Sequence, residues 1–269
     1  MKDNKIPISI AIVCFNEEDN IERCLKSVSW ADEIVIVDSF STDKTVDICK
    51  KYTDRVVQRE WPGFRDQKLY AISLATHEWI LSIDSDEEVS DELASEIQER
   101  LTKDQNAYDG YIMKRHTFFL GRWINHSGWY PDRKLRLFKK QCFTISDGNL
   151  HEKFIVKGKT FKLKGELYHY TYKNISHQLK TIDGFTNIQT DEMIKNNETS
   201  FVVLKMLIKP PVNFFENYIY KLGILDGLAG LIICMLSAYS TFVKFAKLWE
   251  KSKHLSLNES RSEFSGLKD

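Results

Sequence analysis

The sequence lacks a net charge, a paired-cysteine motif and a secretory signal, and each absence excludes a class of protein. Lys plus Arg and Asp plus Glu both number 38, so the overall charge gives no reason to expect a nucleic-acid partner. The five cysteines are odd in number and form no C-x-x-C pair, which argues against a zinc or redox motif and favours a reducing cytoplasm. The apolar stretch after residues 1–7 is too short for a secretory signal, so we expect an intracellular chain.

Internal repeats are also absent, and a length of 269 residues suits one large domain with an appendage. We expect residues 1–195 to form the main domain. Residues 196–252 are expected to form a helical region that associates with a membrane, and residues 253–269 a polar tail.

The N-terminal half alternates short apolar runs with amphipathic segments. Runs 8–14, 34–37 and 79–83 are rich in β-branched residues and end in polar turn residues, as buried parallel strands do. An apolar face at spacing i, i+3, i+4 and i+7 lies between the first two runs: Ile21, Cys24, Leu25 and Val28. The repeated βα pattern predicts an α/β fold whose mostly parallel sheet carries helices on both faces. Residues 108–172 consist of shorter, aromatic-rich pieces, which indicate a mixed or antiparallel region.

Asp84-Ser85-Asp86 follows the third of these apolar runs. The carboxyl ends of strands are where open α/β sheets bind ligands. Two acids at i and i+2 around a tight turn can both face a hard divalent cation, which prefers oxygen ligands and commonly bridges substrate phosphates. The pattern favours Mg or Mn. The alternative is a solvated acidic turn before a helix, whose N-terminus favours acids in any case.

Two more strand ends carry polar residues. Asp38 could accept a hydrogen bond from a nucleobase or a ribose hydroxyl, whereas Asp43 is explained well by simple capping of the next helix. The loop Phe15-Asn16-Glu17 follows the first apolar run. Three ligand-type loops are therefore expected at one edge of the sheet.

Five segments follow one another along the chain in this order: ISIAIVCFNEEDNIERCLKSVSWADEIVIVDSFSTDKT, WPGFRDQKLYAISLATHEWILSIDSDEEVS, GRWINHSGWYPDRKLRLF, LHEKF and LYHYTY. Together they resemble family 2 glycosyltransferases of the GT-A fold, in the branch associated with lipopolysaccharide core assembly. The resemblance covers roughly residues 6–175. It departs from the family at Phe40, where members often have Gly.

The resemblance implies a donor site and a metal site at the strand ends. The residues expected to bind the nucleotide-sugar are Phe15, Asn16, Glu17, Asp38, Lys68, Asp84, Ser85 and Arg136. The residues expected to hold the metal are Asp84, Asp86 and His169. For His169 the alternative is an ordinary hydrogen-bonded histidine among tyrosines.

An inverting transfer needs a carboxylate that takes the proton of the acceptor hydroxyl. By the order of motifs in the family, Glu152 in Leu150-His151-Glu152 is the favoured base. Asp132 is its rival, and could instead hold Arg133 or Arg136.

The C-terminal part contains 17 residues without a charge, Gly227 to Val243. A helix of that length reaches about 26 Å, short of a hydrocarbon core of roughly 30 Å. Because lysines flank both sides, we expect a helical hairpin or an in-plane helix on the inner face of the cell membrane. The alternative is a buried helix that caps the core or forms a dimer contact. Pro210 and Pro211 are expected to break the preceding helix.

The sequence therefore predicts an inverting, metal-dependent transferase. It would move a hexose, with glucose favoured, from a nucleotide-diphosphate sugar, with UDP favoured, to a lipid-linked saccharide such as the lipopolysaccharide inner core. Two alternatives remain open at this point. One is a nucleotidyltransferase, which usually has a Gly-rich, basic loop after its first strand, and the other is a non-catalytic, membrane-associated glycan-binding protein.

Overall fold

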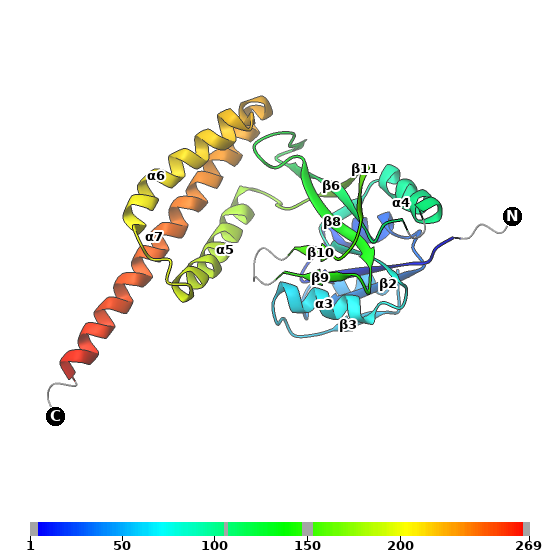
Figure 1. The fold of residues 1–269 in the computed structure, drawn as a ribbon, viewed down its shortest axis with the longest axis horizontal. Coiled ribbons are helices and arrows are strands. Elements are labelled where there is room, and N and C mark those ends of the chain that lie inside the picture. Colours follow the sequence, from blue (N-terminus) through cyan, green and yellow to red (C-terminus); the bar gives the residue numbers. More distant parts are fainter. Residues whose placement is uncertain (1–4, 105–106, 147–152, 266–269) are drawn as a thin grey trace. The chain divides into compact units, whose positions relative to one another are not determined.

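The computed structural model describes residues 5–104, 107–146 and 153–265 (Figure 1). The chain forms two compact units. The first consists of residues 1–123 and 129–171, and the second of residues 124–128 and 172–269. The expected boundary at residue 195 stays a prediction; by contacts between residues, the segment 172–195 belongs to the second unit.

The first unit is built on one mixed sheet with the strand order β3-β2-β1-β4-β8-β6-β11-β5. Its N-terminal strands are β1 (Ile8–Cys14), β2 (Glu33–Asp38), β3 (Val56–Gln58), β4 (Trp79–Asp84) and β5 (Glu87–Val89). Its later strands are β6 (Gly110–Phe119), β8 (Asp132–Lys139) and β11 (Thr160–His169), with β7 (Arg122–Trp123) paired to β6. The strands β9 (Phe143–Ile145) and β10 (Phe154–Val156) form a separate antiparallel pair.

The sheet is parallel where the βα alternation predicted it and mixed beyond that point. β3, β2, β1 and β4 run parallel, whereas β8 is antiparallel to both β4 and β6. β11 then pairs parallel to β6. The predicted α/β class is confirmed, including the change of pattern after residue 108.

Helices cover both faces of this sheet, which is why β1 is buried almost throughout. They are α1 (Ile21–Ser27), α2 (Thr45–Cys49), α3 (Phe64–Leu74) and α4 (Asp91–Asp104). Leu25 of α1 and Leu93 of α4 join the core on one face, and Ala71 of α3 packs with Phe138 on the other. Ser90 caps α4 as expected, since its Oγ accepts the Leu93 N–H at 3.2 Å.

The second unit is helical. It contains α5 (Ile175–Lys195), α6 (Val202–Phe215), the π-helical turn η1 (Glu216–Tyr220), the 3-10 turn η2 (Gly223–Asp226) and α7 (Gly227–Ser265). α6 and α7 lie side by side and are joined through the two turns, so they form a hairpin (Figure 1). Residues 223–253 are long and apolar enough to cross a membrane by length and composition, with a mean hydropathy of 1.7.

The expectation that Pro210 and Pro211 break the helix is wrong. Both prolines lie inside α6, which continues to Phe215. A proline removes one backbone hydrogen bond, yet α6 packs against α7 along its length, and this packing outweighs the local preference. The regular α-helical pattern gives way only afterwards, at the π-helical turn η1.

A buried carboxylate fixes the tip of the hairpin. Asp226 is fully buried and accepts hydrogen bonds from the backbone N–H groups of Asn125 at 3.1 Å and His126 at 2.9 Å. It also accepts the Ser127 hydroxyl at 3.1 Å. Residues 124–128 therefore belong to the second unit although they are distant from it in sequence.

Candidate active site

Three strand ends meet at the carboxyl edge of the sheet. Cys14 at the end of β1 pairs with Asp38 of β2, and the neighbouring Val13 pairs with Asp84 of β4. Because adjacent strands lie about 4.8 Å apart, Asp38 and Asp84 are separated by roughly 10 Å. The structure thus brings two of the expected acids to one edge, as the sequence pattern required.

Asp38 holds the turn that follows β2. It is fully buried, and its Oδ2 accepts the Ser41 N–H at 2.9 Å and the Gln58 amide at 3.0 Å. The Ser41 hydroxyl donates to the other carboxylate oxygen. Within this turn Phe40 has a φ of 61°, the left-handed conformation that favours glycine. Phe40 therefore adopts the same kind of turn that Gly would favour here, but with a strained backbone.

The loops after β1 and β2 are joined by hydrogen bonds. The Asn16 side chain accepts the Thr42 N–H at 2.8 Å, and the Asn16 N–H donates to the Ser41 hydroxyl at 2.8 Å. The Glu17 N–H donates to the Thr45 hydroxyl, also at 2.8 Å. Asn16 and Glu17 thus act here as structural links between the two loops.

Two aromatic rings remain open to solvent on these joined loops. Phe15 is 54% exposed and Phe40 is 50% exposed. Phe40 was not among the site residues expected from sequence. A large apolar side chain in a strained backbone conformation at the ligand edge is the signal that identifies it.

Asp84 lies between two cations. Lys68 of α3 contacts its Oδ1 at 2.9 Å, and Arg136 of β8 contacts its Oδ2 at 2.5 Å. Burial alone would raise the pKa of Asp84, but the charges of Arg136, Lys68 and Arg115 hold it well below its ordinary value. The carboxylate is therefore ionised and forms ion pairs with both Lys68 and Arg136.

Glu87, which was not among the site residues expected from sequence, holds the two arginines next to Asp84. It is buried at 1% exposure and accepts Arg136 at 2.9 Å, Arg115 at 3.3 Å and the Asp84 N–H at 2.9 Å. Arg136 is itself 5% exposed. Two acids and two arginines thus form one buried charge network, whose parts come from β4, β5, β6 and β8.

Asp86 faces His169 of β11. The Asp86 Oδ2 lies 3.3 Å from the His169 Nε2, and the Thr117 hydroxyl lies 3.3 Å from the other ring nitrogen of His169. Burial raises the pKa of Asp86, but the charge and hydrogen bond of His169 together with the charge of Arg115 bring it below its ordinary value. The Asp86 carbonyl also accepts the Tyr170 N–H at 2.9 Å, which fixes the turn against β11.

The Asp86 and His169 atoms fit a divalent cation in spacing and chemistry. Adjacent ligands of an octahedral ion at about 2.1 Å lie about 3.0 Å apart, close to the 3.3 Å found. The Thr117 contact would orient the ring, as the outer partners of metal-binding histidines do. Among the described residues no three His, Cys, Asp or Glu side chains are grouped to hold a metal, since Asp84 is turned to Lys68 and Arg136.

The two candidate bases have different positions. Asp132 at the start of β8 pairs with Arg115 at 2.7 Å and with Lys134 at 3.1 Å. It therefore holds neither Arg133 nor Arg136. Burial raises the pKa of Asp132, whereas Arg115 and Lys134 bring it below its ordinary value. Glu152 lies outside the described residues. Ser85, expected at the donor, is buried.

Comparison with known proteins decides the family. Residues 9–157, more than half of the chain, match glycosyl transferase family 2. The chain belongs to this family. The glycosyltransferase resemblance is thereby confirmed, and the first unit has the mixed, mostly parallel sheet of a GT-A domain.

Similar proteins span nearly the whole glycosyltransferase. The lipopolysaccharide core biosynthesis glycosyltransferase LpsC of Rhizobium meliloti is 27% identical over 256 residues, which cover 92% of this chain and 93% of LpsC. An uncharacterised glycosyltransferase of Rickettsia typhi is 27% identical over 256 residues, 91% of this chain and 87% of the relative. A crystal structure of S. aureus TarS is similar at a TM-score of 0.47 and 16% identity, covering 89% of this chain and 92% of TarS.

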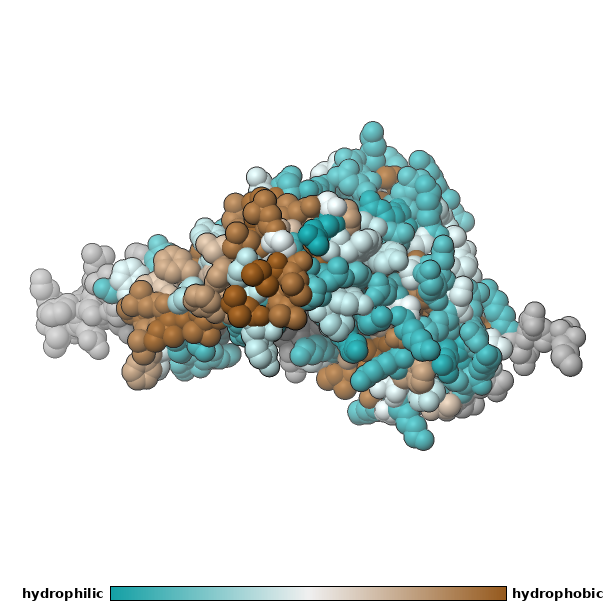
Figure 2. Space-filling model, turned by 90° about the horizontal axis from the view of Figure 1, so that it is seen from above, coloured by the Kyte–Doolittle hydropathy of each residue, from teal (hydrophilic) through white to brown (hydrophobic). Residues whose placement is uncertain are grey.

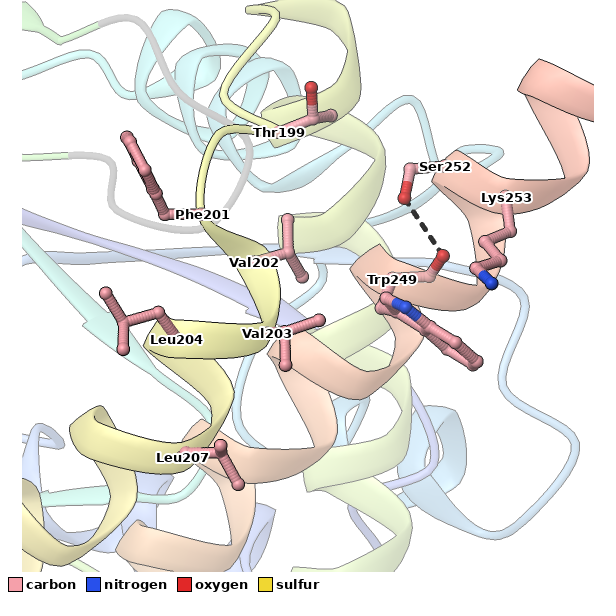
Figure 3. Close-up of a pocket in the computed structure, with 9 residues that line it drawn as sticks. All are labelled: Thr199, Phe201, Val202, Val203, Leu204, Leu207, Trp249, Ser252 and Lys253. Carbon is pink, nitrogen blue, oxygen red and sulfur yellow. Dashed lines mark hydrogen bonds between the residues drawn. The ribbon is translucent and has the colours of Figure 1, made fainter.

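A cavity of the second unit contains none of these side chains. It measures about 620 Å³ and lies in the second unit, between the start of α6 and α7 (Figure 3). Its lining is mostly apolar, with Phe201 and Val202 from the start of α6 and Trp249 from α7, and it includes no acid.

Proposed function

We propose that this glycosyltransferase inverts the configuration of a hexose, with glucose favoured, and moves it from a UDP-sugar to a lipid-linked saccharide with the help of Mg or Mn. One observation carries the proposal. At a single sheet edge, Lys68 and Arg136 converge on Asp84, and the next acid, Asp86, faces His169. A diphosphate with a bound cation requires both kinds of group close together.

The donor would bind across the joined loops. Lys68 and Arg136 both contact Asp84 and are nearly buried, so they are already oriented toward one carboxylate and could contact the oxygens of a diphosphate beside it. Phe15 and Phe40 offer exposed rings on which a nucleobase can stack, an interaction worth about 1–3 kcal/mol per base. Asp38 would support this surface by holding the Phe40 turn.

Asp86 and His169 would hold the divalent cation. Once bound, such an ion acts as a Lewis acid that neutralises the charge developing on the departing diphosphate. Asp84 would keep Lys68 and Arg136 in position for the same phosphates. The residues of this chain therefore act by binding and orientation.

We propose Glu152 as the general base. A carboxylate that accepts the acceptor proton works best when its pKa is near the working pH. Asp132 does not suit this role, because Arg115 and Lys134 hold its pKa below the ordinary value. Its contact with Arg115 suits a positioning role, since Arg115 also binds Glu87.

We also propose that the acceptor lies at a membrane surface, at the inner face of the cell membrane. The 27% identity to LpsC over most of both chains supports a saccharide of the lipopolysaccharide core type. Figure 2 adds a second line of support, because apolar colouring covers the helical hairpin, whereas the first unit is mostly hydrophilic in the same view.

Charge is almost excluded from the hairpin tip. Between Lys209 and Lys244 the sequence holds three charged residues, Glu216, Lys221 and Asp226. Glu216 and Lys221 pair with each other at 2.8 Å, and Asp226 is buried among hydrogen-bond donors. The exposed large apolar and aromatic side chains there are Phe215, Ile219, Tyr220, Leu222, Ile224, Leu225 and Leu228. A tip without unpaired charge can enter the lipid boundary at low cost, with the flanking lysines left at the head groups.

Release of nucleoside diphosphate from a panel of nucleotide-sugars tests the transfer. We expect turnover with a UDP-sugar and Mn, loss of turnover with chelator, and an increase on addition of core lipid extract. NMR of the product should show the inverted anomeric configuration. Retention of configuration would contradict the inverting mechanism.

Three substitutions make this test residue-specific. Asp86→Asn should lower kcat by about 100-fold, corresponding to about 2.7 kcal/mol of lost stabilisation. The matched Asp54→Asn, at an exposed aspartate of the same unit, should leave kcat unchanged. Glu152→Gln should abolish transfer without weakening UDP binding. Full activity of Asp86→Asn in the presence of chelator would refute the metal role.

A further inference from the structure

A second group of cations lies in the first unit, outside the candidate active site. A pocket of about 200 Å³ opens between β6, β8 and β11. Four positive side chains line it, Lys114, Arg133, Lys162 and Lys164, beside the apolar residue Ile112. No step of the proposed transfer uses these four cations.

The strand register forces like charges together. Lys114 of β6 and Arg133 of β8 are paired directly across the strands. Their sequence neighbours Arg115 and Asp132 bind each other at 2.7 Å. Because successive side chains of a strand alternate between faces, Lys114 and Arg133 share the opposite face. Directly opposed like charges destabilise a sheet, so the pair requires compensation.

The compensation available within the chain is incomplete. Glu166 approaches Lys114 at 3.4 Å, but it also accepts a hydrogen bond from Tyr130 at 2.5 Å and binds His116 at 2.9 Å. In residues 5–104, 107–146 and 153–265, no acidic side chain forms an ion pair with Arg133, Lys162 or Lys164. Of the four cations, Lys114 alone has a carboxylate partner among these residues, and it shares that partner with Tyr130 and His116.

A fixed bulge adds the remaining two lysines. The register of β11 against β6 shifts between Lys162 and Glu166. Glu96 of α4 accepts the backbone N–H groups of Lys164 at 2.8 Å and Gly165 at 2.9 Å, which anchors the bulge. Leu163 is buried in the core at 4% exposure, so the lysines on either side of it are directed to the pocket.

Gly165 makes this anchoring tight. A Cβ at that position would lie 2.5 Å from the Leu93 Cα, closer than side chains approach backbone atoms. The bulge is therefore pressed against α4 and fixed by two hydrogen bonds. Bulges of this kind re-aim side chains and commonly occur beside functional sites.

We propose that this pocket binds a phosphoryl group, as a phosphomonoester or a phosphodiester. Four cations on one small pocket exceed what a single carboxylate can satisfy, whereas a phosphoryl group offers several oxygens and up to two negative charges. Arg133 supplies a planar fork suited to phosphate, and the lysines supply point charges around it. The volume equals roughly six water molecules in the liquid, which is enough for a phosphoryl group with a partial water shell.

This assignment does not depend on sugar transfer, so binding alone tests it. We would titrate the full chain by calorimetry with inorganic phosphate and with glycerol 3-phosphate, in the absence of nucleotide. Flotation with phosphatidylcholine vesicles, with and without phosphatidylglycerol, provides the arm for a lipid phosphodiester. The pocket variant is Arg133→Gln with Lys164→Gln, and Lys162→Gln alone is a milder second variant.

Two control variants locate the binding. Lys50→Gln with Lys51→Gln removes the same charge from an exposed part of the first unit. Lys68→Gln removes a cation from the candidate donor site instead. We expect saturable binding of one soluble phosphate probe per chain, weakened at least tenfold in the pocket variant, weakened less in Lys162→Gln, and unchanged in both controls. A tenfold loss confined to vesicles with phosphatidylglycerol would equally support the site, with a lipid as the source of the phosphoryl group.

Two results would overturn the proposal. One is that neither the soluble probes nor anionic vesicles bind differently to the pocket variant and the wild type. The other is that phosphate binding disappears in Lys68→Gln but persists in the pocket variant, which would assign it to the donor site. Melting temperatures of all variants identify any that fail to fold. The pocket variants lose mutually repelling cations, so their melting temperatures are expected to equal that of the wild type or exceed it.

Discussion

The two units differ in how much contiguous apolar surface they expose to solvent. The first unit covers its sheet with helices, and its exposed large apolar side chains are scattered, with Phe15 and Phe40 at the ligand edge. The second unit leaves apolar residues exposed along the whole hairpin, from Phe201 to Trp249. Contiguous exposed apolar surface marks a surface that meets a non-aqueous partner. The charge network of the first unit and the hairpin of the second should therefore respond to different perturbations.

The largest expected effect comes from breaking the buried charge network. Arg136→Ala removes a cation that contacts both Asp84 and Glu87, and leaves Lys68 and Arg115 as the remaining cationic partners of these two carboxylates. Loss of one member of a buried ion pair costs about 3–5 kcal/mol. Urea unfolding should show this loss. The control Lys50→Ala, at an exposed cation of the same unit, should change stability little, and equal stabilities of Arg136→Ala and the control would mean that the network is not buried in solution.

Acid should weaken the same network and spare the hairpin. The pKa values of Asp84, Asp86 and Asp132 are lower in the folded state than their ordinary values. Their stabilisation is therefore fully present above the unfolded-state pKa of about 3.9 and is lost as the pH falls through the lower folded-state values. The melting temperature of the first unit should fall by more than about 5 °C between pH 5 and pH 3. A constant melting temperature over that range would contradict the ionised network.

Membrane binding by the hairpin should weaken when a charged side chain is introduced at its tip. Leu228 is 72% exposed near the tip, and Leu228→Asp places a charge where we propose that lipid lies. Burial of an aspartate in lipid is costly, so vesicle affinity should fall at least about tenfold, or about 1.4 kcal/mol. Ile155→Asp, at an exposed apolar residue of the first unit, is the matched control. If both variants bind vesicles as the wild type does, the hairpin is not the membrane contact.

The smallest effect concerns the strained turn at the donor edge. Phe40→Gly relieves a left-handed φ of 61° but increases the freedom of the unfolded chain, so stability should change by less than about 1 kcal/mol. If Phe40 stacks on the nucleobase, the KM for the donor should rise several-fold while kcat stays the same. An unchanged KM would remove Phe40 from the donor site.

The features that depend on local pattern were predictable from sequence. The apolar runs located β1, β2 and β4, and the polar residues after them marked the ligand edge. Asp86 and His169 lie 83 positions apart in the sequence, and the structure places them 3.3 Å from each other; their role as metal ligands stays a prediction. The Ser90 cap of α4 followed from a short local motif.

Features that depend on strand register were not predictable. Glu87 reads as one more acid after Asp86, and only the pairing of β4, β6 and β8 reveals that it receives Arg115 and Arg136. The hydrogen bonds from Ser41 and Gln58 to the Asp38 carboxylate form once β2 and β3 pair, and the role of Asp38 in donor binding stays a prediction. The expectation that Pro210 ends the helix was wrong, because packing of α6 against α7 outweighs the effect that proline has on an isolated helix.

Asp226 has a consequence for any shortened form of the protein. It accepts hydrogen bonds from Asn125, His126 and Ser127, residues that the sequence places between two strands of the first unit. A protein cut before residue 226 would leave these donors without their acceptor, and the connection from β7 to β8 would lose its anchor. The helical region is thus more than a detachable tail, because the chain enters it once in mid-sequence and again at residue 172.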